Sequence, residues 1–137
     1  MKIIALTLFA LTTSSAFACS CQDWGTASEM LKRHSEAFLA IAESDSVVVG
    51  TSSEPGEGKL LKTKLSVLRD YKRKKKTVEV ETFENNGGNC GVSFKKDDGV
   101  WLVFADKYNN KLHVNGCTLG SALDAGTYPL IRGLNNL

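Results

Sequence analysis

The sequence predicts a mainly β fold in the form of a small closed or partly open barrel, with one helix before the strands. Two observations support this prediction. Short segments with a two-residue or continuous apolar pattern recur along the chain, and turn residues separate them. They cover residues 47–51, 59–71, 77–83, 92–94, 100–105 and 111–114. This strand count fits a five-stranded Greek-key barrel of the OB type, although a sandwich has the same signature.

The helix is predicted over residues 26–42. Thr26 and Glu29 form a T-x-x-E capping box, in which each side chain can accept a hydrogen bond from the other residue's backbone N–H. Apolar residues then recur at three- and four-residue steps, which predicts one buried stripe. The stripe comprises Ala27, Met30, Leu31, Ala37, Phe38, Ile41 and Ala42.

The strand patterns also predict which side chains are buried. The apolar run Val47–Val49 is typical of a buried strand, and in the segment 77–83 Val78 and Val80 alternate with Glu79 and Glu81. Residues 59–71 place Leu61, Thr63, Leu65 and Val67 on one face. A tight turn is expected over 95–99. The tail, 118–137, has a mixed pattern that allows a short C-terminal helix.

The first 18 residues have the layout of a secretory signal peptide. Lys2 precedes an apolar run over 3–11, and a small-residue stretch ends in Ala16-Phe17-Ala18. We expect cleavage between Ala18 and Cys19, followed by secretion or release into a periplasm. The apolar run is too short to span a bilayer, so we expect no stable membrane association. The alternative is a lipoprotein acylated on Cys19, which the bulky Phe17 disfavours.

The residues that follow, 19–137, have the length of one domain and contain four cysteines, Cys19, Cys21, Cys90 and Cys117. An even number in a small exported protein predicts two disulfides. A bridge between Cys19 and Cys21 would close too small a ring. Both other connectivities tie the start of the mature chain to distant positions.

Nothing in the sequence suggests an enzyme. The motifs G-x-S-x-G, H-E-x-x-H and the phosphate-binding glycine loop are absent, and we expect no cofactor and no intrinsic metal. Residues 93–96 formally match S-x-x-K but lack the motifs that accompany it in enzymes, so we interpret the match as chance. A basic run could bind an acidic polysaccharide, whereas no nucleic-acid partner is expected. It comprises Lys72, Arg73, Lys74, Lys75 and Lys76. The interpretation that we prefer is a solvated hairpin turn, whose positive charge is offset by the glutamates that follow, Glu79, Glu81 and Glu84.

Several motifs in the same order resemble a known family. They are C-S-C at Cys19–Cys21, S-D-S-V-V-V-G-T, K-L-S-V-L-R-D-Y-K, N-C-G-V-S-F, V-W-L-V-F-A and L-H-V-N-G-C, which ends at Cys117. This set resembles the netrin-like (NTR) domain, and within that group the N-terminal domain of the tissue inhibitors of metalloproteinases. The inhibitors' third N-domain disulfide has no counterpart in this sequence.

The resemblance implies an OB-like five-stranded barrel over 19–137, with disulfides Cys19–Cys90 and Cys21–Cys117. It also implies inhibition of a zinc metalloendopeptidase, whose catalytic zinc the α-amino and carbonyl groups of Cys19 would chelate. Ser20 would point toward the specificity pocket of the protease, with Cys21, Asn89 and Cys90 forming neighbouring contacts. The alternative is a non-inhibitory extracellular module that binds an acidic glycan or another protein.

Overall fold

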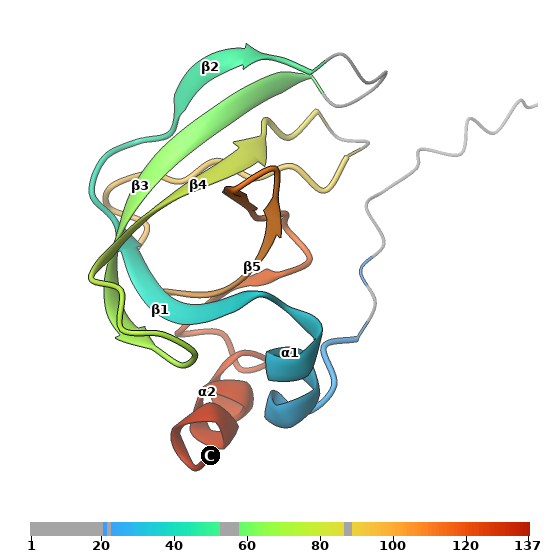
Figure 1. Cartoon of the computed structure of the whole chain (residues 1–137), viewed down its shortest axis with the longest axis vertical. Helices are drawn as coiled ribbons and strands as arrows, with labels where there is room; N and C mark the ends of the chain where they lie inside the picture. Colours follow the sequence, from blue (N-terminus) through green and yellow to red (C-terminus); the bar gives the residue numbers. More distant parts are fainter. Residues whose placement is uncertain (1–20, 22, 53–57, 87–88) are drawn as a thin grey trace, which may run out of the picture.

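Five strands close into a barrel in the computed structural model, which describes residues 21, 23–52, 58–86 and 89–137 (Figure 1). Two short outer strands and two helices accompany the barrel. The elements are α1 (Ala27–Arg33), β1 (Glu36–Ala42), β2 (Val47–Thr51), β3 (Lys59–Asp70), β4 (Thr77–Phe83), β5 (Trp101–Tyr108), β6 (Lys111–His113), β7 (Leu119–Ser121) and α2 (Tyr128–Asn135). No helix among the described residues has the length and apolar character needed to cross a membrane.

The order of the strands confirms the OB-like barrel. The path runs β1-β3-β4-β6-β5, and β1 also pairs with β5, which closes the sheet. All of these pairs are antiparallel except β4 with β6, which is parallel. The β1–β5 pairing distinguishes this barrel from a sandwich of two separate sheets. On its outside, β2 extends the edge of β3 and β7 pairs with β5.

Two apolar clusters hold the fold together. The barrel interior contains, among others, Phe38, Leu65, Val80, Val103 and Leu112. A second cluster lies between the outer face of β1 and β5 and the two helices, which Figure 1 shows together at one end of the barrel. Here Phe104 and Met30 are buried with residues of α2. The expected C-terminal helix therefore exists and covers the barrel wall.

The prediction of one helix over 26–42 is wrong for its second half. Helix α1 ends at Arg33, His34 is extended, and residues 36–42 form β1. The segment from Ala37 to Ala42 is entirely apolar, and β1 pairs on both edges. One face, with Phe38, lies in the barrel interior, whereas on the other face Ala37 is buried and Ile41, expected in the buried stripe, is exposed. Such a short apolar run has no period that distinguishes a buried strand from a buried helix.

Three further expectations need correction. The run Val47–Val49 is exposed, since β2 lies outside the barrel. Residues 92–94 are irregular, although Phe94 is buried in the core. Glu81 is buried rather than exposed, and its carboxylate pairs with Lys111 Nζ at 3.0 Å. The burial of Val78 and Val80 and the turn over 95–99 are confirmed.

The capping box at the start of α1 is confirmed and gives a pH-dependent prediction. Glu29 Oε2 accepts a hydrogen bond from the Thr26 N–H at 2.8 Å, and this bond lowers the pKa of Glu29 below 4.5. The contribution of Glu29 to stability is therefore present above about pH 4.5 and is lost as the pH falls through the folded-state pKa.

We expect the Glu29→Ala variant to be less stable than the wild type at pH 7, with a difference in stability that narrows as the pH falls below about 4.5 and through the folded-state pKa. Urea unfolding followed by tryptophan fluorescence at several pH values measures this difference. A difference that stays constant from pH 7 to pH 3 would contradict the prediction.

Candidate functional site

One of the expected disulfides, Cys21–Cys117, joins the start of the described chain to the segment that follows β6. The two Cα atoms lie 5.2 Å apart, and 96 positions separate the residues in the sequence. This bridge confirms one of the two pairings implied by the resemblance. Because Cys117 lies in the short connection between β6 and β7, the segment at Cys21 is covalently fixed to the barrel.

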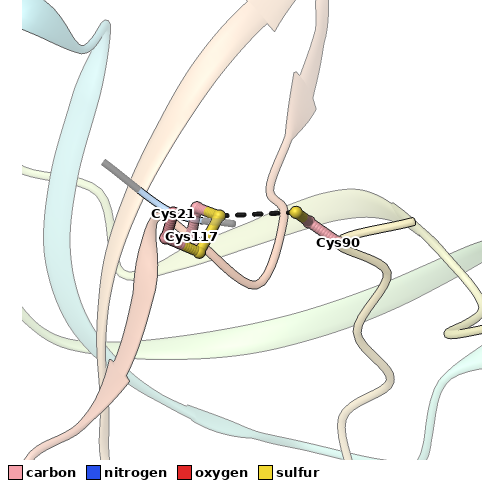
Figure 2. A group of neighbouring side chains, drawn as sticks. All are labelled: Cys21, Cys90 and Cys117. Carbon is pink, nitrogen blue, oxygen red and sulfur yellow. Dashed lines mark hydrogen bonds between the residues drawn. A yellow bond between two sulfur atoms is a disulfide. The ribbon is translucent and has the colours of Figure 1, made fainter. Parts of the chain in front are cut away.

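Cys90 lies beside this bridge. Its Sγ atom is 3.4 Å from the Sγ atom of Cys117, and Figure 2 shows the Cys90 side chain directed at the disulfide. Cys90 is itself disulfide-bonded. Its predicted partner, Cys19, lies outside the described residues, as does Ser20. Because sulfurs in disulfides carry no hydrogen, the close approach of Cys90 to Cys117 is a van der Waals contact.

The three sulfur atoms of Cys21, Cys90 and Cys117 lie within 4.8 Å of one another. That spacing would suit a metal ion if the cysteines were thiolates, since the thiolate is the form that binds metals. All three are in disulfides. In this oxidised state, the cluster serves as a covalent anchor.

Trp24 is a second anchor, which the sequence analysis did not identify. Its indole Nε1 donates a hydrogen bond to the carbonyl oxygen of Cys117 at 2.7 Å, and its ring packs edge-on against Phe104 with centroids 5.7 Å apart. Gly120 makes room for the indole, because a Cβ atom there would lie 2.7 Å from Trp24 Cη2. The only local sign of this contact in the sequence is the presence of a tryptophan three residues after Cys21.

The side chain of Asn89 forms hydrogen bonds with the described backbone before and after Cys90. Its Oδ1 accepts hydrogen bonds from the N–H groups of Asn86 and Gly91, at 3.1 and 3.2 Å. Its Nδ2 donates to the carbonyl oxygen of Glu84 at 3.0 Å. Asn89 therefore fixes the backbone on both sides of Cys90, in the manner of asparagine in turns.

Close backbone packing fixes the other side of Cys90. A Cβ atom at Gly91 would lie 2.5 Å from the carbonyl oxygen of Phe83 and 2.6 Å from that of Glu84. These are backbone atoms at the end of β4, so they cannot move aside as a flexible side chain could. The Gly116 N–H also donates to the Cys90 carbonyl oxygen at 2.6 Å. Together, these contacts make Asn89–Cys90 a rigid ridge beside the disulfide.

A cleft of about 330 Å³ opens next to this ridge. Its walls include polar side chains from three barrel strands: Glu81, Asp106 and His113. Glu81 is ion-paired with Lys111, and Asp106 Oδ2 lies 2.9 Å from His34 Nδ1. The carboxylates that face the cleft are thus already engaged by neighbouring side chains.

The structure gives most of the basic run internal partners. Lys72 Nζ donates to the carbonyl oxygens of Leu31 and His34 at the end of α1. Arg73 Nε and Lys75 Nζ both contact the same oxygen of Glu36, at 3.0 and 3.1 Å. Within the part of the chain that the structure describes, the side chains of Lys74 and Lys76 make no ion pair or hydrogen bond. These two lysines are exposed.

Asp70 shapes the same turn. Its carboxylate accepts hydrogen bonds from the backbone N–H groups of Lys72, Arg73 and Lys75. The turn between β3 and β4 is therefore an ordered structure that places cations against Glu36. The sequence alone suggested a turn whose side chains are solvated. In the structure, hydrogen bonds to Asp70 and ion pairs with Glu36 hold the turn in a defined conformation.

The fold and the site together define a disulfide-anchored OB-like barrel whose N-terminal segment is fixed beside the Asn89–Cys90 ridge. Comparison with known proteins does not narrow this class: no protein-family model matches the chain, and no curated protein does either.

Proposed function

We propose that this chain is a secreted inhibitor of zinc metalloendopeptidases and acts through its N-terminal end at Cys19. The observation that carries the proposal is the Cys21–Cys117 disulfide with Cys90 in contact beside it. It fixes the position two residues after the proposed mature terminus, next to the ridge at Asn89 and Cys90.

The chemistry follows from a free α-amino group at Cys19. Such a group has a pKa of about 7.7 to 8, so a substantial fraction is uncharged near pH 7. The neutral amine and the Cys19 carbonyl oxygen would bind the protease's zinc together in a five-membered chelate. A catalytic zinc keeps one position open for water, and occupation of that position removes the nucleophile.

Rigidity supports the proposal energetically. Binding a flexible segment costs conformational entropy, which weakens the affinity. In this chain the Cys21 bridge, the Trp24 hydrogen bond and the hydrogen bonds of Asn89 fix the surroundings of the N-terminal end before a partner arrives. Ser20 would then enter the specificity pocket, with the ridge contacting the rim of the protease cleft.

The proposal is tested with the mature protein beginning at Cys19, assayed against a panel of zinc endopeptidases. We expect inhibition that is competitive with an active-site hydroxamate, because both ligands occupy the zinc. Inhibition that persists when the hydroxamate is saturating would contradict chelation. Absence of inhibition across the panel would contradict the function itself.

A second candidate function is the binding of an acidic polysaccharide. A shallow groove over β4 favours it, since lysines from β3, β5, β6 and the β3–β4 turn line the groove. These are Lys62, Lys75, Lys107 and Lys111. Glu79 and Glu81 also line it and partly offset the positive charge.

For this candidate, we expect a salt-sensitive retention on immobilised heparin that the Lys107→Glu variant weakens. Lys32→Glu on α1 is the matched control, because it makes the same charge change outside the groove. Equal retention of both variants and the wild type would contradict a polysaccharide site in the groove.

A further inference from the structure

The approach of Cys90 to a neighbouring disulfide has a chemical consequence of its own. Thiol–disulfide exchange requires a thiolate to reach one sulfur of a disulfide. Cys90 Sγ lies 3.4 Å from Cys117 Sγ, already in contact with the atom that such a thiolate would attack. Forming a bond at the usual S–S length of about 2.05 Å brings the two sulfur atoms about 1.4 Å closer. Because the three sulfur atoms lie within 4.8 Å of one another, they are not collinear, so the Cys90 side chain also has to rotate into line with the Cys21–Cys117 bond.

We propose that opening the bridge at Cys90 triggers an exchange that moves the disulfide from Cys21–Cys117 to Cys90–Cys117. An external dithiol first reduces the bridge that holds Cys90 and is itself oxidised to a disulfide. The Cys90 thiolate then attacks Cys117 Sγ. The new Cys90–Cys117 bond forms, the Cys21–Cys117 bond breaks, and Cys21 leaves with the electron pair as a thiolate that water protonates.

The backbone supports the product of this exchange. The hydrogen bond from the Gly116 N–H to the Cys90 carbonyl oxygen, 2.6 Å long, already holds the two segments side by side.

The consequence is that one reduction event releases both N-terminal tethers. Cys21 loses its bond to the barrel, and the former partner of Cys90, predicted to be Cys19, is a free thiol. Trp24 still holds the chain downstream through its bond to the Cys117 carbonyl oxygen. The barrel would keep one disulfide while the segment before Trp24 comes free. If the proposed function holds, this exchange would switch off the inhibitor.

Two variants of the mature chain test the exchange without a reductant. In Cys19→Ser, Cys90 has lost its predicted partner, and we expect labelling with N-ethylmaleimide to fall on Cys21, with Cys90 and Cys117 recovered as a cross-linked peptide. In the matched control Cys90→Ser, the attacking thiol is absent, so Cys21–Cys117 stays intact and the label falls on Cys19. Label on Cys90 or Cys117 in the Cys19→Ser protein would overturn the proposal.

A second measurement starts from the folded wild type, so that it does not depend on how a variant folds. Treatment with a limiting amount of dithiol, followed by labelling, is expected to modify Cys19 and Cys21 together. Modification of Cys19 and Cys90 with Cys21–Cys117 intact would overturn the exchange. These assays read thiols and not inhibition, so they distinguish failure of the exchange from failure of the proposed function.

Discussion

Replacing both Cys21 and Cys117 with serine is expected to lower the free energy of unfolding by about 3 to 4 kcal/mol. The bridge spans 96 positions, and the chain-entropy model assigns about 4.7 kcal/mol to a 100-residue loop. The remaining bridge at Cys90 already shortens the effective loop, which reduces the expected loss. Changing both residues leaves no new thiol that could exchange with Cys90.

Urea unfolding of the double variant and the wild type measures this loss. Ser28→Ala is a suitable surface control, since Ser28 is exposed on α1. A destabilisation below 1 kcal/mol would show that the N-terminal segment contributes little to the fold, which would remove the rigidity on which the proposed function depends.

Removing the two cations that face Glu36 is expected to cost a similar amount. The Glu36 side chain is only 3% exposed, and its Oε1 atom contacts both Arg73 Nε and Lys75 Nζ. Its Oε2 atom has no hydrogen-bond partner among the described residues. In the Arg73→Ala/Lys75→Ala variant the buried carboxylate has no compensating charge, and leaving a buried charge unpaired costs about 3 to 5 kcal/mol.

The same argument predicts that the loss of stability depends on the negative charge of Glu36, which a stability measurement can test. Adding Glu36→Gln to the double variant removes the buried charge, so we expect it to restore most of the lost stability. Lys74→Ala is the matched control in the same turn and should change little, because that side chain is exposed. If the triple variant is no more stable than the double variant, an uncompensated charge is not the cause of the loss.

Local patterns in the sequence predict most of the barrel. The alternation along 59–71 and 77–83 predicts that Leu61, Thr63 and Leu65 of β3 and Val78 and Val80 of β4 face the core, and their burial is confirmed. Glu81 departs from this pattern, because it is buried as well. The segment 36–42 is different, because it is apolar at every position from Ala37 to Ala42 and therefore shows no alternation of polar and apolar residues. Only its pairing with β3 and β5, which involves residues far away in the sequence, makes it a strand.

The candidate site could be predicted only in part, because its contacts also join residues that are far apart in the sequence. The Cys21–Cys117 pairing came from the resemblance, whereas cysteine spacing alone left two connectivities open. The hydrogen bond from Trp24 to Cys117 spans 93 positions, and no local pattern predicts such a contact. Likewise, the burial of Glu36 and Glu81 depends on cations that other segments supply.

The most direct test of the proposed function compares two proteins that differ by one residue at the N-terminus. The first begins at Cys19, and the second has one additional alanine before Cys19. The extension displaces the α-amino group from the chelating position while the barrel and its disulfides remain unchanged. We predict that the first protein inhibits a zinc endopeptidase of the panel and that the second does so at least 100-fold more weakly, a difference of about 2.7 kcal/mol. Equal inhibition constants would contradict chelation by Cys19.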